Sequence, residues 1–289
     1  MSTRPREGRA RWRRGRTIGA GSAKTAAQAR AELDTAALEH DLRGALDGEV
    51  RFSDGDRALY ATDGSNYRQV PIGVVIPAHA DDVLSTLRIA RRHGAPVLAR
   101  GGGTSLAGQC CNTAVVLDMT KYFNRILAID TDRRRARVEP GCVLDHLRSI
   151  AGRYGLTFGP DPSTHNRCTL GGMIGNDSCG VHSVQAEFYG PGARTAEQIE
   201  SMDIVTADGV RMTVGATTEA ELEAIVAAGG RRGEIYGGMR ALRDRYADLI
   251  RARYPRIVRR VSGYNLPYLL PEHGFNVARA RWWAVRAPS

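Results

Sequence analysis

The sequence has little of what membrane-spanning or exported chains require. No run of about 18 apolar residues occurs in its 289 residues, and the mean hydropathy is −0.33, so no membrane-spanning helix is predicted. The N-terminus has no apolar secretory core, and Arg13-Arg14 is not followed by the apolar stretch of a twin-arginine signal. These absences predict a cytoplasmic protein, with peripheral association with a membrane left open.

Cysteine is scarce, and its spacing argues against metal binding and disulfides. Five cysteines occur, an odd number, without Cys-x-x-Cys, and the sequence contains no His-Glu-x-x-His. It therefore lacks a spaced ligand set for zinc or an iron–sulfur cluster. A disulfide framework is not expected in a chain without an export signal. We expect no metal site and interpret the cysteines as buried thiols: Cys110, Cys111, Cys142, Cys168 and Cys179.

Positive charge is in excess, but it is concentrated at one end of the chain. The formal net charge is +10, and residues 1–30 hold nine basic side chains against the single acid Glu7. The remaining residues are nearly neutral. Residues 1–33 are therefore interpreted as a disordered basic leader, either passive or a nonspecific anion-binding tail. Nucleic-acid binding would rest on this leader alone, and no specific nucleic-acid partner is expected.

Hydrophobic periodicity predicts a mixed α+β chain. A buried strand over 73–77, an amphipathic helix over 81–93 and a strand over 96–100 form a strand–helix–strand unit. A further strand is expected at 114–118, and two hairpins are expected, one from strands 126–130 and 135–139 and one from strands 204–206 and 210–214 around Asp208-Gly209. Further helices are expected at 34–47, where Asp34 can cap the start, and at 143–154, 218–228 and 235–251. We expect one domain over 34–278, with subdomains at about 50–120 and 121–278.

A first glycine cluster, residues 100–108, directly follows a predicted strand. Consecutive glycines expose bare N–H groups against which a phosphate can lie without meeting a Cβ. The Walker spacing fails because Gln109 and Cys110 stand where Lys and Ser or Thr are required, and Leu106 occupies the third Rossmann glycine position. The cluster therefore indicates a phosphate site of another kind, with a structural turn without ligand as the alternative.

A second glycine-rich segment runs from residue 158 to 180. Small residues alternate there with side-chain donors and acceptors. The segment is too apolar for a solvated loop, and we interpret it as too rich in glycine for a regular helix or strand. It indicates a large ligand with both polar and apolar parts.

Several motifs occur in an order that identifies a family. They are Pro96–Gly108, Glu139–Gly141, Gly159–Thr164, Thr169–Asn176 and Val261–Leu266. Over about residues 35–278 the chain resembles the flavin-binding domain of the vanillyl-alcohol oxidase and p-cresol methylhydroxylase (PCMH) superfamily. Within it, the chain is similar to the branch of D-lactate and D-2-hydroxyglutarate dehydrogenases. The resemblance implies an α+β, two-subdomain PCMH-type FAD-binding fold.

The resemblance also implies FAD as the cofactor. Its pyrophosphate would lie over the amides of Gly101, Gly102, Gly103, Thr104 and Ser105. The other implied cofactor-binding residues are Arg100 and Gly108 in the same loop, Pro160, Asp161, Ser163, Thr164, Thr169, Gly171, Gly172, Asn176 and Cys179 in the second segment, and Ile204 and Val205 near the adenine. Because Thr104 stands where covalently flavinylated members often carry His, noncovalent FAD is expected.

The implied reaction moves the α-hydrogen of a D-2-hydroxy acid, such as D-lactate or D-2-hydroxyglutarate, to the flavin as hydride. The electron acceptor is not identified, and no catalytic residue is assigned. The family pattern continues beyond residue 278 into a substrate (cap) domain, whereas 279–289, with Trp282 and Trp283, lack that pattern. We expect a truncated flavin-binding half with an atypical tail at 279–289. The alternative is a non-catalytic flavin-binding module or subunit that a second chain completes.

Two groups of polar residues are left with alternative interpretations. His165 and His182 flank the flavin segment and either lie near the isoalloxazine or pack within the loops, whereas His146 is expected on a helix surface. A run of arginines near the C-terminus forms either a solvated basic face or a patch for an anionic substrate or partner. Its members are Arg251, Arg253, Arg256, Arg259 and Arg260.

Overall fold

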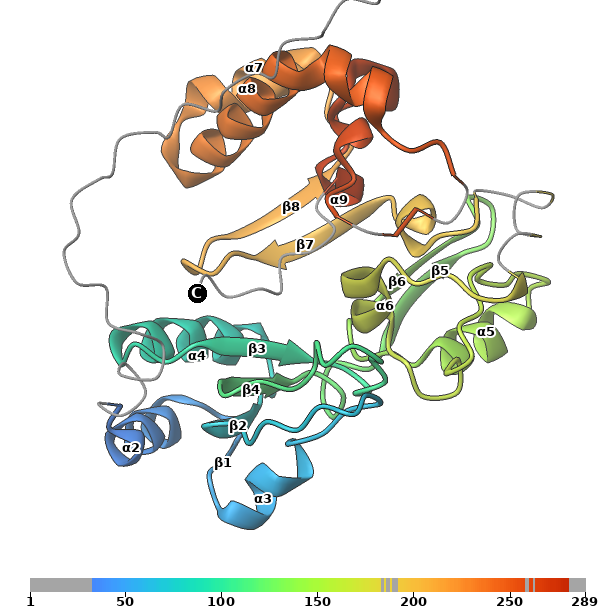
Figure 1. The fold of residues 1–289 in the computed structure, drawn as a ribbon. Helices are drawn as coiled ribbons and strands as arrows, with labels where there is room; N and C mark the ends of the chain where they lie inside the picture. The colour runs from blue at the N-terminus through green and yellow to red at the C-terminus, as the bar shows by residue number, and fades with distance from the viewer. Residues whose placement is uncertain are drawn as a thin grey trace, which may run out of the picture. The chain divides into compact units, whose positions relative to one another are not determined.

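The computed structural model describes residues 33–280 apart from 183, 184, 186, 187, 189–191, 258, 259 and 262. The predicted leader up to residue 32 and the tail from residue 281, with its two tryptophans, lie outside the described residues. The chain from Asp34 onward forms one compact unit. This unit mixes helices and strands, as predicted (Figure 1).

A four-stranded sheet forms the first part of the unit, with the order β1-β2-β4-β3. Strands β2, β3 and β4 run parallel, and β1 pairs with β2 antiparallel. Every residue of β2 and β4 is buried, as expected for central parallel strands. The predicted strands are confirmed to within two residues. The bounds are β1 Glu49–Arg51, β2 Gly73–Ile76, β3 Val97–Arg100 and β4 Val115–Asp118.

Three helices accompany this sheet. The side chain of Asp34 caps the first by accepting a bond from the amide of Ala37, as the sequence predicts. Helices α2 and α4 pack against each other (Figure 1). Strand β1 and the short helix α3 were not predicted from the sequence. The helices are α2 Thr35–Ala45, α3 Asp54–Leu59 and α4 Ala80–Arg92.

The predicted hairpin β5–β6 is followed by helices α5 and α6, which share a small core. Its buried members are Cys142, Leu144, Leu147, Cys168, Leu170 and Met173. Helix α6 corrects the expectation that the second glycine-rich segment is too rich in glycine for a helix. The bounds are β5 Ile126–Asp130, β6 Arg135–Val138, α5 Leu144–Gly152 and α6 Leu170–Asn176.

The third part is the predicted hairpin β7–β8 covered by helices. Its core contains Met212, Val214, Leu222, Tyr236 and Phe275. Helix α8 begins five residues earlier than predicted, and α9 includes Arg279 and Ala280, which the sequence analysis placed in the tail. The α-helices and strands are β7 Ser201–Val205, β8 Arg211–Gly215, α7 Glu219–Ala228, α8 Gly230–Arg253 and α9 Val277–Ala280, and the 3-10 turns are η2 Thr195–Gln198, η3 Leu266–Leu269 and η4 Pro271–His273.

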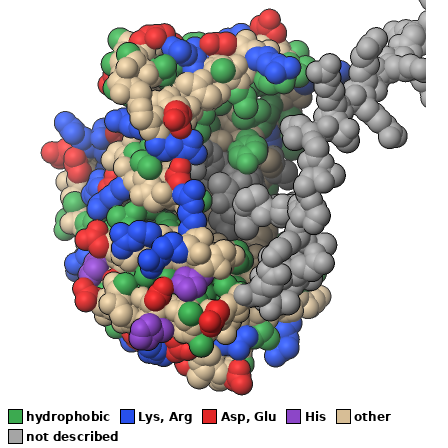
Figure 2. All heavy atoms as spheres, turned by 90° about the vertical axis from the view of Figure 1, so that its left-hand side faces the viewer, with side chains coloured by type: hydrophobic (Ala, Val, Ile, Leu, Met, Phe, Trp, Pro, Cys, Tyr) green, Lys and Arg blue, Asp and Glu red, His purple; other side chains and the backbone are tan. Residues whose placement is uncertain are grey.

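Acidic and basic side chains are interspersed on the face that Figure 2 shows. This mixture agrees with the near neutrality of the chain beyond its first 30 residues. Within the described part of the chain, no helix combines the length and the apolar character that crossing a membrane requires.

Glu49 on β1 ties the sheet edge to the segment after β4. Its carboxylate accepts bonds from Arg51 Nε at 2.9 Å and Tyr122 Oη at 2.8 Å, and it pairs with Lys121. The bond from Lys121, followed by those from Arg51 and Tyr122, lowers the pKa of Glu49 from 4.5 to about 2. The ionised form is therefore favoured in the folded state, and its contribution to stability is lost as the pH falls from 4.5 toward 2.

We therefore expect Glu49→Gln to lower the free energy of unfolding at neutral pH by about 1 kcal/mol, because the pairs are partly solvated. The difference from wild type should shrink as the pH falls below 4.5. Urea unfolding at stepwise lower pH measures it. Glu39→Gln, which removes an exposed pair with Arg43, is the charge-matched control. A Glu49→Gln deficit that stays constant with pH would contradict this account.

Candidate functional site

The first glycine cluster forms a turn at the carboxyl end of the parallel strand β3. Gly103 and Gly108 have φ angles of +63° and +77°, in the left-handed region that favours glycine. Arg100 holds the turn by donating bonds to the carbonyl oxygens of Thr62 at 2.9 Å, Tyr60 at 3.2 Å and Cys110 at 3.0 Å. The guanidinium of Arg100 is therefore occupied by these three carbonyl oxygens and holds the turn in place.

The turn offers amide groups that the protein does not use. Within the described part of the chain, the N–H groups of Gly101, Gly102, Gly103 and Thr104 donate no hydrogen bond to a protein atom. The turn also holds the segment around Gly64 in place, because the carbonyl of Gly103 accepts a bond from the amide of Gly64 at 2.9 Å. Adjacent free N–H groups after a strand provide donors that suit an anion.

The turn lies directly against the second glycine-rich segment. A Cβ at Gly101 would overlap the hydroxyl of Thr169, and one at Gly102 would overlap the carbonyl oxygen of Arg167. The structure therefore brings the two predicted segments together. The carbonyl of Arg167 explains why Gly102 has no side chain. The glycine at this position therefore does not by itself locate a phosphate.

Most predicted residues of the second segment take part in hydrogen bonds within the protein. Thr169 is buried and caps α6 by accepting a bond from the amide of Gly172 at 3.3 Å. The amide of Gly171 donates to the carbonyl of Pro140 at 2.8 Å, and Asn176 Nδ2 donates to the carbonyl of Gly172 at 3.3 Å. Thus these residues build α6 and its junction with the preceding turn.

The 160–164 stretch borders the start of this segment. The carbonyl of Pro160 accepts a bond from Arg148 at 3.1 Å, and that of Thr164 accepts bonds from two amides of the following turn. Asp161 accepts bonds from the amide and Nδ1 of His182. Ser163 is exposed and makes no side-chain hydrogen bond with the described residues. Its hydroxyl is therefore available to a ligand.

Ile204 and Val205 on β7 are not brought to the glycine turn by any described contact. The side chain of Ile204 packs against the core under α7 and α8. Val205 is partly buried, and its strand neighbour Asp203 pairs with Arg137 of β6. The structure therefore places these two residues with the third part of the unit.

The histidines near the segment are paired with carboxylates. His165 Nδ1 lies 2.7 Å from Asp145 Oδ2, and His182 Nδ1 lies 2.7 Å from Asp161 Oδ2. Both histidines are exposed. His146 lies exposed on α5, as predicted.

Three thiols are buried as predicted, those of Cys111, Cys142 and Cys168, whereas Cys110 and Cys179 are only partly buried. Burial, with a smaller effect of the Asp63 carboxylate, raises the pKa of Cys111 to about 11. The thiol of Cys111 is therefore protonated at neutral pH and is a poor nucleophile.

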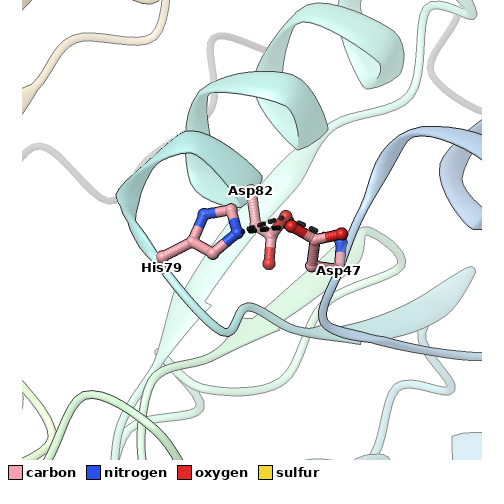
Figure 3. Close-up of side chains that lie close together, drawn as sticks. All are labelled: Asp47, His79 and Asp82. Atoms are coloured by element: carbon pink, nitrogen blue, oxygen red, sulfur yellow. Dashed lines mark hydrogen bonds and ion pairs between the residues drawn. The ribbon is translucent and has the colours of Figure 1, made fainter.

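One group of possible metal ligands lies outside the glycine segments and escaped the sequence analysis, because its members are far apart in the chain. Asp47, His79 and Asp82 come together where α4 begins (Figure 3). Asp82 is almost fully buried and accepts bonds from the amides of Asp47, Gly48 and Ala78 at 2.8–3.0 Å. The carboxylate oxygens of Asp82 are thus occupied by backbone amides, and we assign the group a structural role.

His79 completes this group from the N-cap position of α4. Its Nε2 lies 2.9 Å from Asp47 Oδ2, and this bond raises the pKa of His79. Protonated His79 thus adds an ion pair between the chain before β1 and the start of α4.

The overlap at Gly102 gives a direct test of the contact between the segments. We expect Gly102→Ala to lower the free energy of unfolding by about 2–3 kcal/mol, because the added methyl group forces the backbone at Arg167 away. Gly175→Ala in α6 is the control, since its Cβ meets no atom within 4 Å. It should be neutral or stabilising by up to about 1 kcal/mol. Urea unfolding of both measures this, and equal effects would contradict the contact.

Comparison with known proteins agrees with this geometry. A family model described as FAD binding domain matches residues 71–215. A D-2-hydroxyglutarate dehydrogenase of Pseudomonas putida is 35% identical over 237 residues, which cover 80% of this chain and 23% of that protein. The glycolate oxidase subunit GlcD of Bacillus subtilis is 33% identical over 57% of this chain and 34% of its own length. The chain thus spans about a quarter to a third of these relatives.

Solved structures share the fold at low sequence identity. A carbohydrate oxidase from Microdochium nivale superposes with a TM-score of 0.53 at 18% identity, covering 64% of this chain and 38% of that chain. p-Cresol methylhydroxylase superposes with a TM-score of 0.53 at 17% identity, covering 62% of this chain and 35% of that chain. The residues that match the family model include both the glycine turn and the second glycine-rich segment. The chain therefore belongs to the family of FAD-binding domains with the PCMH-type fold.

Proposed function

We propose that this chain binds FAD noncovalently and serves as the flavin-binding part of an oxidoreductase that acts on D-2-hydroxy acids such as D-lactate or D-2-hydroxyglutarate. The observation that carries the proposal is the glycine turn after β3, in which the amides of residues 101–104 have no protein acceptor among the described residues. The turn lies inside the residues that match the FAD-binding domain.

The donor set fits a pyrophosphate. In the proposal, the amides of residues 101–104 hold its oxygens, as backbone N–H groups in other phosphate turns do, whereas the amide of Ser105 is directed at the thiol of Cys110. The roles of Arg100 and Thr169 are to position the turn, since the side chains of both face protein atoms. Ser163, which has no side-chain partner in the described structure, is a donor available to the rest of the cofactor.

The substrate class is supported by the named activities of the relatives. Two of them are called D-2-hydroxyglutarate dehydrogenase and D-lactate dehydrogenase, the latter from Archaeoglobus fulgidus and 35% identical over 50% of this chain. Bound FAD supplies a two-electron acceptor for the α-hydrogen of such acids. The chain's own residues hold and orient that cofactor, and the electron acceptor is left unassigned.

The pyrophosphate position is tested at Thr104, which is partly exposed. We expect Thr104→Glu to weaken FAD binding at least tenfold, because its carboxylate repels the pyrophosphate. Thr104→Gln, of equal size without the charge, is the control and should bind FAD within about threefold of wild type. FAD titrations at low and high salt measure both, and added salt should narrow the gap. Equal affinities of the two variants would contradict the position of the pyrophosphate.

Substrate and cofactor linkage are tested on the FAD-loaded chain. Acid precipitation should release the flavin into the supernatant, as noncovalent binding requires. Under anaerobic conditions, D-2-hydroxyglutarate and D-lactate should bleach the flavin absorbance of this chain poorly or not at all, because the groups that hold the substrate are expected in the substrate (cap) domain. Fast bleaching by a D-hydroxy acid but not by L-lactate would contradict this expectation and show that the catalytic groups lie within the chain. A complete absence of bleaching by FAD-loaded protein would favour the alternative, a flavin-binding module or subunit that needs a second chain for turnover.

A further inference from the structure

A cavity of about 490 Å³ lies where the end of α8 meets the turns η2, η3 and η4. Its volume is in the range of small-molecule sites. Four arginines line it, Arg194, Arg251, Arg256 and Arg260, together with His273. Three of them belong to the arginine run that the sequence analysis left with two interpretations. Arg253 of that run does not line the cavity, and Arg259 lies outside the described residues.

The carboxylates of the cavity do not neutralise its arginines. Glu272 forms two bonds with Arg251, at 2.9 and 3.0 Å, and Glu197 pairs with Arg194 at 2.6 Å. Arg256 and Arg260 form no ion pair with a carboxylate among the described residues. Arg256 bonds to the carbonyl of Arg251 at 3.5 Å. The cavity therefore keeps an excess of positive charge.

Arg260 is held in a fixed position. It bonds to the carbonyl of Pro255 at 3.2 Å and to Asn265 Oδ1, and its guanidinium lies 4.4 Å from the ring centre of Tyr254. Burial and the neighbouring charge of Arg194 lower the pKa of Arg260. A guanidinium with a second cation nearby is stabilised by an anion that approaches it.

Two buried donors in this region also lack a partner. Nε of Arg194 and Nδ2 of Asn265 make no hydrogen bond with the described residues, although only 5% and 3% of these residues are exposed. Buried donors in folded proteins are nearly always satisfied, so each of these two donors points to a partner that the described residues do not supply. Arg194 lines the cavity and Asn265 holds Arg260, so both donors adjoin the same basic surface.

We propose that this cavity binds a small organic dianion whose carboxylate or phosphate groups contact Arg256 and Arg260. Guanidinium groups match the paired oxygens of both acids. The apolar part of the lining, from Ile250, Ile257 and Leu270, suits a short hydrocarbon chain between the acidic groups. The proposal does not depend on the proposed flavin chemistry, because none of the contacts involves the glycine turn.

Isothermal titration at low ionic strength tests the proposal, with glutarate, glycerol phosphate and inorganic phosphate as probes on the full chain. Glutarate or glycerol phosphate should bind more tightly than inorganic phosphate, and comparing the two identifies the acid group. Arg256→Gln should weaken the binding five- to tenfold, and Arg260→Gln at least tenfold. Arg253→Gln, which removes the same charge outside the cavity, should change it less than twofold. FAD titrated in excess glutarate should bind as it does without glutarate.

Three results would overturn the proposal. The first is the absence of binding of every probe to the wild-type chain. The second is an equal loss in Arg253→Gln and Arg256→Gln, which would show a diffuse attraction to the basic surface. The third is competition between FAD and glutarate, which would assign the cavity to the flavin. Arg256 is exposed, and among the described residues its side chain bonds to a single carbonyl. Arg256→Gln therefore still tests the proposal if Arg260→Gln fails to fold.

Discussion

The close backbone contact between the glycine turn and residues 167–169 is the constraint on which the rest of the site depends. A side chain at Gly101 or Gly102 would occupy the space of Thr169 or Arg167. Protein atoms fill this face of the turn. The turn can therefore contact a ligand through its N–H groups at residues 101–104, which have no acceptor among the described residues. The packing that excludes side chains and the exposure of donors are therefore two consequences of one arrangement.

The same kind of contact recurs along the second segment and explains much of its glycine content. A Cβ at Gly171 would overlap Pro140, and one at Gly180 would overlap the carbonyl of Asp161. Gly141 likewise lies against the carbonyl of Met119. Glycine loses more conformational entropy on folding than other residues do, and close backbone packing offsets that cost here. The segment is therefore a packed junction between the sheet and the α5–α6 layer.

The sequence predicted those elements whose pattern is local and missed those that depend on contacts. The apolar run of β2 and the Asp-Gly turn between β7 and β8 are local signals, and both elements are present. Helix α6 was missed because its glycines lower helix propensity, whereas the Thr169 cap and the packing of Leu170 and Met173 stabilise it. The order β1-β2-β4-β3 and the cluster around Asp82 join residues far apart in sequence, which no periodicity encodes.

Helix α6 connects the glycine turn with the charged cluster at the arginine cavity. Thr169 caps its start and meets Gly101 of the turn, while Asp177 ends it with a φ of +47°. Asp177 is buried, which raises its pKa, and it accepts a bond from the amide of Ala196 at 2.8 Å. It also lies 3.6 Å from Arg194, which lines the arginine cavity. A helix of seven residues is about 10 Å long. The glycine turn and the charged cluster at the cavity thus lie at the two ends of one short helix.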